Sequence, residues 1–186
     1  IQLKPDEANG YWNKSLLKLL QGDYKEGWKL YEWRRQNKNM RGNYKIYDQP
    51  LWLGKESIVD KILLVEFEQG FGDMIQFCRY VPMLEKLGAK VILQIPKELT
   101  SLIKTMRSEF LIIEKDQSLP KFDFHIPIMS LPVVLGTTLE NLAQVQYYLT
   151  AEPDLQKQWQ ERLGPKTRLR VGFCWSGRRD TWINQH

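Results

Sequence analysis

An alternation of short apolar runs with amphipathic segments, beginning near residue 61, constrains this chain more than any other feature. Residues 61–67 are almost continuously apolar, as is typical of a parallel strand that is covered on both faces. A turn with two glycines follows, and residues 74–87 then form a predicted helix that ends at Gly88. The pattern continues with strands over 90–95, 110–114 and 122–126 and a helix over 97–106. This order predicts a Rossmann-like α/β domain with an open parallel sheet, which we assign to residues 61–150.

Residues 1–35 are predicted to form a helical hairpin. Apolar residues recur at three- and four-residue spacings over residues 12–20, and a Gly-Asp pair ends this first helix. Tyr24, Trp28 and Tyr31 share one face of the second helix, because positions i, i+4 and i+7 are neighbours. One such hairpin cannot bury its apolar face alone. We therefore expect it either to dock on the following domain or to continue helical repeats that precede it.

Residues 36–60 are predicted to be a linker, because they are rich in Asn, Lys and Gly and poor in aliphatic residues. Within this linker, the stretch 49–54 places Leu51 and Trp52 directly after Pro50. We expect these two large apolar side chains to pin the linker to the α/β domain.

Residues 151–186 bring a second change of pattern. A helix is predicted over 154–163, with apolar residues at i, i+4 and i+8, and an apolar strand is predicted over 169–175. Because a lone strand needs a sheet to join, we interpret this segment as a connecting helix and the first strand of a second, truncated Rossmann-like domain.

The composition excludes several classes of protein. Cys78 and Cys174 are the only cysteines, and His125 and His186 are the only histidines, so we expect neither a disulfide framework nor a metal site. The longest apolar runs have the length of a strand, far short of the roughly 20 residues that span a bilayer. We therefore predict a cytoplasmic protein without a transmembrane segment.

The net charge is +5, from 27 Lys and Arg against 22 Asp and Glu, and the basic excess gathers in residues 29–45 and 165–186. Such segments attract nucleic acid, acidic membranes or phosphorylated small molecules, or they form a solvated surface with a flexible linker. No nucleic-acid-binding motif accompanies them, so nucleic acid is not expected as a partner.

The turn over residues 70–73, Gly-Phe-Gly-Asp, is the candidate site, because it follows an apolar strand and opens a helix. Ligands of open α/β sheets bind in the crevice at the carboxyl ends of the strands. The turn has two of the three glycines of the dinucleotide-binding fingerprint, with Ile75 at the third position, so dinucleotide binding is not predicted. Asp73 either caps the helix or acts as a general base that faces the crevice.

A family resemblance rests on the order and spacing of several motifs. Residues 68–77, Glu-Gln-Gly-Phe-Gly-Asp-Met-Ile-Gln-Phe, followed by Arg79-Tyr80, resemble bacterial glycosyltransferases with tetratricopeptide repeats. The chain is more distantly similar to heptosyltransferases and O-GlcNAc transferase-like proteins. The hairpin resembles one tetratricopeptide repeat, with Gly27 where the family usually has Ala. The other motifs of the resemblance lie at residues 49–54, 122–125, 129–132, 136–137 and 171–177.

The resemblance implies the N-terminal half of a GT-B glycosyltransferase, whose N-terminal domain holds the acceptor and whose C-terminal domain holds the nucleotide sugar. Asp73 matches the proposed base that deprotonates the acceptor hydroxyl. No cofactor and no metal are implied, because the nucleotide sugar is a substrate and the chain has no Asp-x-Asp motif.

The same resemblance implies further site residues. Substrate contacts are expected from the turn and from the strand over 122–126, at Gln69, Gly70, Gly72 and His125. Gln69 binds a sugar hydroxyl or stabilises the turn, and His125 lies at the crevice edge or is a satisfied structural histidine. Donor phosphates are expected at Ser176, Gly177 and Arg178.

Two functions stay open on the sequence alone. In the first, the parent protein transfers a sugar from a nucleotide-sugar donor to a hydroxyl of a protein or glycan acceptor, and this chain by itself is inactive. In the second, the hairpin and its basic linker recruit a protein partner, and the α/β domain is a degenerate, non-catalytic scaffold.

Overall fold

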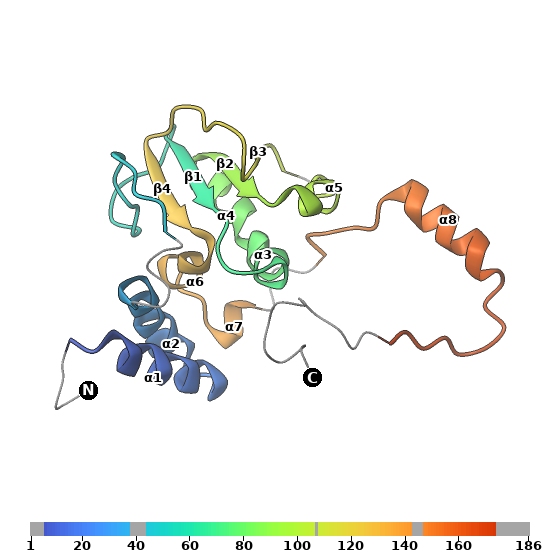
Figure 1. The fold of residues 1–186 in the computed structure, drawn as a ribbon, viewed down its shortest axis with the longest axis horizontal. Coiled ribbons are helices and arrows are strands. Elements are labelled where there is room, and N and C mark those ends of the chain that lie inside the picture. Colours follow the sequence, from blue (N-terminus) through green and yellow to red (C-terminus); the bar gives the residue numbers. More distant parts are fainter. Residues whose placement is uncertain (1–5, 38–43, 107, 143–146, 174–186) are drawn as a thin grey trace. The chain divides into compact units, whose positions relative to one another are not determined.

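The computed structural model describes residues 6–37, 44–106, 108–142 and 147–173 (Figure 1). The chain divides into two compact units, Ile1–Thr150 and Ala151–His186, and each is described by itself.

The centre of the first unit is a four-stranded sheet in the order β3-β2-β1-β4, in which every neighbouring pair is parallel. The strands are β1 (Ile62–Glu66), β2 (Lys90–Ile95), β3 (Leu111–Glu114) and β4 (Phe124–Pro127). This arrangement confirms the predicted Rossmann-like α/β fold with an open parallel sheet. The predicted strand over 122–126 begins two residues later than expected.

The two faces of the sheet are covered differently. One face packs into the main core against the helices that follow β1, and it contributes Leu63, Val65, Leu93 and Ile95. The other face carries Leu64, Ile92 and Ile113, which pack under Tyr47, Leu119 and Phe122 from connecting segments. Burial on both faces explains why β1 is apolar at consecutive positions instead of at alternate ones.

The helices between the strands are shorter than predicted. The helix expected over 74–87 is instead α3 (Phe71–Phe77), a 3-10 turn (Cys78–Tyr80) and α4 (Val81–Lys86). Pro82 explains the break, because proline lacks a backbone N–H and is tolerated only in the first turn of a helix. The helix expected over 97–106 is a 3-10 turn (Lys97–Leu99) followed by α5 (Thr100–Ile103).

Short helical segments also follow β4. They are a 3-10 turn (Ile128–Ser130), α6 (Leu131–Val134) and α7 (Leu139–Leu142).

The linker is pinned to the sheet as predicted. Leu51 forms an isolated parallel bridge with His125, and the backbone N–H of Trp52 donates to the His125 carbonyl at 2.9 Å. The Trp52 side chain is buried, and its Nε1 donates to the Glu56 carbonyl at 2.9 Å. The linker therefore extends the edge of the sheet beside β4.

The predicted hairpin is present as α1 (Ala8–Leu20) and α2 (Tyr24–Tyr31), followed by a 3-10 turn (Glu32–Gln36). It docks on the α/β domain, where the Trp28 ring meets the Phe77 ring of α3 edge-on at 5.6 Å (Figure 1). The docking buries Tyr31 and packs Trp28 of α2 against the domain, whereas leucines of α1 stay exposed. Its relationship to tetratricopeptide repeats stays a prediction.

The two hairpin helices cross closely at Gly27. A Cβ at this position would lie 2.7 Å from Leu19 Cδ2 and 2.8 Å from Leu19 Cγ, so an alanine does not fit there without a shift. We expect Gly27→Ala to lower the free energy of unfolding by about 1–2 kcal/mol in urea titrations. Overpacking of about 1–3 kcal/mol outweighs a gain of up to about 1 kcal/mol in helix propensity.

Gly72→Ala is the matched control for that change, because Gly72 is also helical and a Cβ there meets nothing within 4 Å. It should leave the stability unchanged or raise it by up to about 1 kcal/mol. Equal effects of the two substitutions would contradict the close helix crossing.

In the second unit, α8 (Pro153–Leu163) confirms the helix predicted over 154–163. Residues 169–173 have no regular secondary structure, so the strand predicted over 169–175 is wrong for its described part. No strand occurs among the described residues of this unit. Cys174 and Trp175 lie outside the described residues.

Candidate functional site

The candidate site is the segment that joins β1 to α3, at the carboxyl end of the parallel strands. Glu66 ends β1, and α3 begins at Phe71 with Gly70 as its N-cap. Between them, Gln69 has a φ of 64°, which is uncommon for a residue other than glycine. This edge of the sheet is where ligands of open α/β proteins bind.

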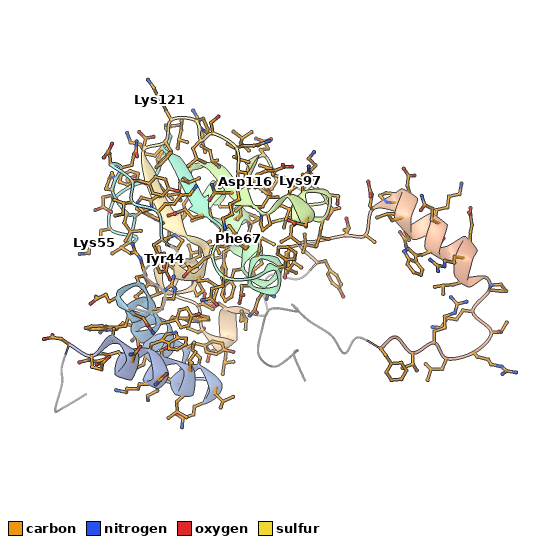
Figure 2. The ribbon with its side chains drawn as sticks, viewed as in Figure 1. Tyr44, Lys55, Phe67, Lys97, Asp116 and Lys121 are labelled. Carbon is orange, nitrogen blue, oxygen red and sulfur yellow. The ribbon has the colours of Figure 1, made fainter. Side chains whose placement is uncertain are left out.

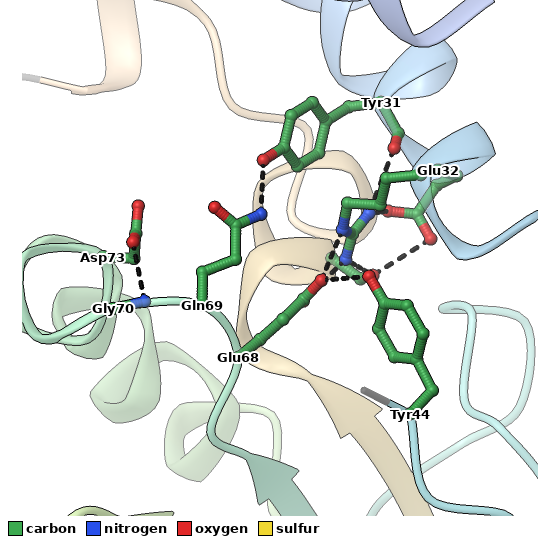
Figure 3. Close-up of polar contacts among 9 residues, drawn as sticks. Tyr31, Glu32, Tyr44, Glu68, Gln69, Gly70 and Asp73 are labelled. Carbon is green, nitrogen blue, oxygen red and sulfur yellow. Dashed lines mark hydrogen bonds and ion pairs between the residues drawn. The ribbon is translucent and has the colours of Figure 1, made fainter. Parts of the chain in front are cut away.

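Asp73 caps α3, as one of the two predicted alternatives states. Its Oδ2 accepts a hydrogen bond from the Gly70 backbone N–H at 2.9 Å (Figure 3). The Gly70 carbonyl accepts from the Met74 N–H at 3.1 Å. The side chain is half-buried, so it is not sealed in the core. Its role as a general base stays a prediction.

The two glycines of the turn serve different purposes. A Cβ on Gly70 would lie 3.2 Å from Asp73 Oδ2, so the absence of a side chain at Gly70 makes room for the capping carboxylate. Gly72 is exposed, and a Cβ there would meet nothing within 4 Å. A Cβ at position 70 would therefore crowd the capping carboxylate, whereas position 72 has room for a side chain.

A fully buried arginine, Arg34, holds the turn against the hairpin. Its Nε donates to Glu68 Oε1 at 2.7 Å, and one terminal nitrogen donates to Glu68 Oε2 at 2.9 Å. The same nitrogen donates to Ser130 Oγ at 2.8 Å, and the other donates to Glu32 Oε1 at 2.7 Å and to the Tyr31 carbonyl at 3.3 Å. Figure 3 labels two of these partners, Glu32 beside the hairpin and Glu68 in the turn.

The protonation of this network follows from its burial and charges. Burial lowers the pKa of the Arg34 guanidinium, but the hydrogen bonds and the charge of Glu68 outweigh it and hold the pKa above its usual range. Burial, followed by the charge of Glu68, raises the pKa of Tyr44. The Tyr44 hydroxyl therefore keeps its proton and donates it to Glu68 Oε1 at 2.5 Å.

Gln69 connects the turn to α2. Its Nε2 donates to the Tyr31 hydroxyl oxygen at 2.7 Å, and Gln69 is an exposed residue. Burial raises the pKa of Tyr31, and the hydrogen bond from Gln69 offsets part of that rise, so the phenol stays protonated near neutral pH. The predicted role of Gln69 in stabilising the turn is thus visible, and its sugar contact stays a prediction.

His125 lies within β4 instead of at the rim of the site. Its Nδ1 lies 2.6 Å from Glu66 Oε1, both side chains are buried, and the Tyr47 ring centre is 4.8 Å from the imidazole. These contacts favour the structural interpretation of His125. The predicted phosphate contacts Ser176, Gly177 and Arg178 lie outside the described residues.

Asp73 lines none of three hollows in the described part of the first unit. One of about 640 Å³ opens where the strands begin, lined by Ile62, Lys90 and Leu111. Figure 2 shows Lys121, another residue of its wall, at the far end of the sheet from Phe67, which follows β1. A smaller hollow of about 40 Å³ lies beside α3, between Trp28 and Gln76.

None of the helices in the described ranges is long and apolar enough to cross a membrane. The same ranges hold no group of three or more His, Cys, Asp or Glu side chains placed to bind a metal ion.

The sheet order, the parallel pairing and the turn after β1 define the first unit as a Rossmann-like α/β domain. Comparison of the chain with protein-family models, with curated proteins and with solved structures found no match.

Proposed function

We propose that the first unit is the acceptor-side domain of a glycosyltransferase, which moves a sugar from a nucleotide-sugar donor to an acceptor hydroxyl. The observation that supports this proposal is the half-buried Asp73 carboxylate at the carboxyl ends of the parallel strands. A hydroxyl that attacks an anomeric carbon must lose its proton, and a carboxylate within hydrogen-bond reach accepts it. The nucleoside diphosphate leaves with the bonding electron pair.

In this proposal the residues of the turn divide the work. Asp73 is the base, Gln69 contacts the acceptor, and Gly70 lets the carboxylate lie close to the backbone. His125 positions Glu66 beneath the site and does not touch the acceptor, because it is buried against that carboxylate. Positive charge for the leaving diphosphate comes from a donor-binding domain, with Ser176, Gly177 and Arg178 as its first contacts. The reaction takes place in the cytoplasm.

A second candidate is a non-catalytic interaction module, and the outer face of α1 favours it. Leu16, Leu17 and Leu20 are 43%, 54% and 85% exposed, and they are neighbours on one helix. Neighbouring exposed apolar side chains are typical of protein-binding surfaces. In this candidate, the hairpin recruits a partner and Asp73 only caps α3.

A donor screen separates the two candidates. The full-length natural protein is incubated with a panel of nucleotide sugars and mixed glycan and protein acceptors, and released nucleoside diphosphate is measured together with the glycosylated product. The proposal expects one donor to give product above the background without protein. The interaction module would be favoured instead if none of the nucleotide sugars released nucleoside diphosphate and the protein captured a partner whose binding is lost in Leu20→Lys.

A further inference from the structure

We infer that Tyr31, a residue of the hairpin, forms one half of the acceptor-binding site together with Gln69, and that this pair selects an uncharged saccharide. The inference rests on the proposed function, because it names the substrate class of the same site. It assigns the hairpin a direct part in substrate recognition.

The first support is the placement of the pair beside Asp73. Figure 3 shows Gln69 between Tyr31 and Asp73, with its amide nitrogen on the side of Tyr31. Asp73 lies close enough for its charge to contribute to the raised pKa of Tyr31. Side chains from α2 and from the turn therefore face the same place.

The second support is the hydrogen-bonding capacity that the pair keeps. The Tyr31 oxygen accepts from Gln69, and no hydrogen bond donated by the Tyr31 hydroxyl is found among the described residues. The amide oxygen of Gln69 is an acceptor on an exposed side chain. One donor and one acceptor beside a carboxylate match adjacent hydroxyl groups of a sugar ring.

The third support is the backbone of Gln69. Its φ of 64° is tolerated best by glycine and asparagine, yet the chain has a longer side chain there. Glycine occupies the next position, so the turn does have a flexible residue. Strained residues of this kind are concentrated at ligand-binding sites.

The charge around the pair sets the class of ligand. The charged groups that act on the Tyr31 hydroxyl are Arg34, Glu68 and Asp73, a negative balance. All five N–H groups of Arg34 already donate, to Glu68, Glu32, Ser130 and the Tyr31 carbonyl. No donor of Arg34 is left for a phosphate or carboxylate, so an anionic acceptor is disfavoured here.

The test measures binding without transfer. The ¹⁵N-labelled 186-residue chain is titrated with neutral methyl hexopyranosides and, separately, with glucose 6-phosphate and glucuronate. The side-chain amide signal of Gln69, identified by its loss in Gln69→Gly, reports binding. Tyr31→Phe removes only the hydroxyl and keeps the ring that packs on Trp28 at 5.6 Å.

We expect at least one neutral glycoside to shift the Gln69 signal saturably and to bind more tightly than either anion. Tyr31→Phe should lower the affinity for that glycoside about 3- to 10-fold, because one hydrogen bond is lost. We expect a similar loss of affinity in Gln69→Gly, in which binding is followed through the backbone amide signal of Gly70. Its melting temperature should stay within about 3 °C of wild type, because relief of the left-handed backbone offsets the lost contact.

Three results would overturn the inference: no saturable shift with any neutral glycoside, binding of an anion as tight as the best glycoside, or unchanged affinity in Tyr31→Phe. Each of these leaves the proposed function standing if Asp73→Asn still abolishes transfer. Conversely, glycoside binding that depends on Tyr31, together with full transfer by Asp73→Asn, would keep the saccharide site and reject the proposed base.

Discussion

Arg34→Met is expected to lower the free energy of unfolding by about 3–5 kcal/mol, the largest stability effect of any single substitution considered for this chain. Methionine keeps the apolar stem but removes the charge, which is fully buried between Glu68 and Glu32. Among the residues that the structure describes, Glu68 is then left as a buried carboxylate with the Tyr44 hydroxyl as its remaining hydrogen-bond partner. Urea unfolding followed by tryptophan fluorescence measures the loss.

Two further variants show that the loss comes from the uncompensated charge. Adding Glu68→Gln to Arg34→Met should restore part of the stability, because a neutral amide is less costly to bury than a carboxylate. Arg79→Met should cost about 1 kcal/mol or less, because Arg79 is half-exposed and contacts Tyr148 and a carbonyl instead of a carboxylate. A loss below about 1 kcal/mol in Arg34→Met would contradict the role of Arg34 as the link between hairpin and turn.

The sheet could be predicted from the sequence because strands of this kind are specified locally. β2 has the predicted bounds of residues 90–95, and β1 lies within the predicted run over 61–67. Both strands are buried on two faces, so their apolar residues are consecutive and stand out against the polar segments beside them. The segment over residues 74–87, by contrast, has the apolar spacing of one continuous helix, and Pro82 divides it into two.

The network around Arg34 could not be predicted in the same way. In the sequence, Arg34 belongs to a basic stretch over residues 29–45, which is typical of a solvated surface. Its burial depends on Glu68 and Ser130, which are 34 and 96 positions further along the chain. No local pattern encodes partners at such separations. The one signal in the sequence was Glu68, a charged residue directly after the apolar run over residues 61–67.

Position 69 shows the same limit at the candidate site. The glycines on either side of Phe71 indicate a turn in the sequence, yet the residue of this turn with the left-handed backbone is Gln69. Its contact to Tyr31 depends on how the hairpin docks on the α/β domain. The spacing of residues within the hairpin or within the turn does not specify that docking. Capping by Asp73, in contrast, is a contact over three residues and was predictable.

Asp73→Asn is expected to lower the rate of sugar transfer by about 10²- to 10⁴-fold, the usual contribution of a general base. The amide oxygen still accepts from the Gly70 N–H, so the cap survives and the fold should lose no more than about 1 kcal/mol. Asp60→Asn is the matched control. It makes the same change at an exposed position ahead of β1, where a φ of 60° also suits asparagine.

The most direct test is therefore one paired measurement on the full-length protein: transfer rate and melting temperature for Asp73→Asn and Asp60→Asn, beside wild type. We predict that Asp73→Asn loses transfer while its melting temperature stays near that of wild type, and that Asp60→Asn changes neither. Transfer by Asp73→Asn at the wild-type rate would show that the carboxylate at position 73 is a helix cap and nothing more.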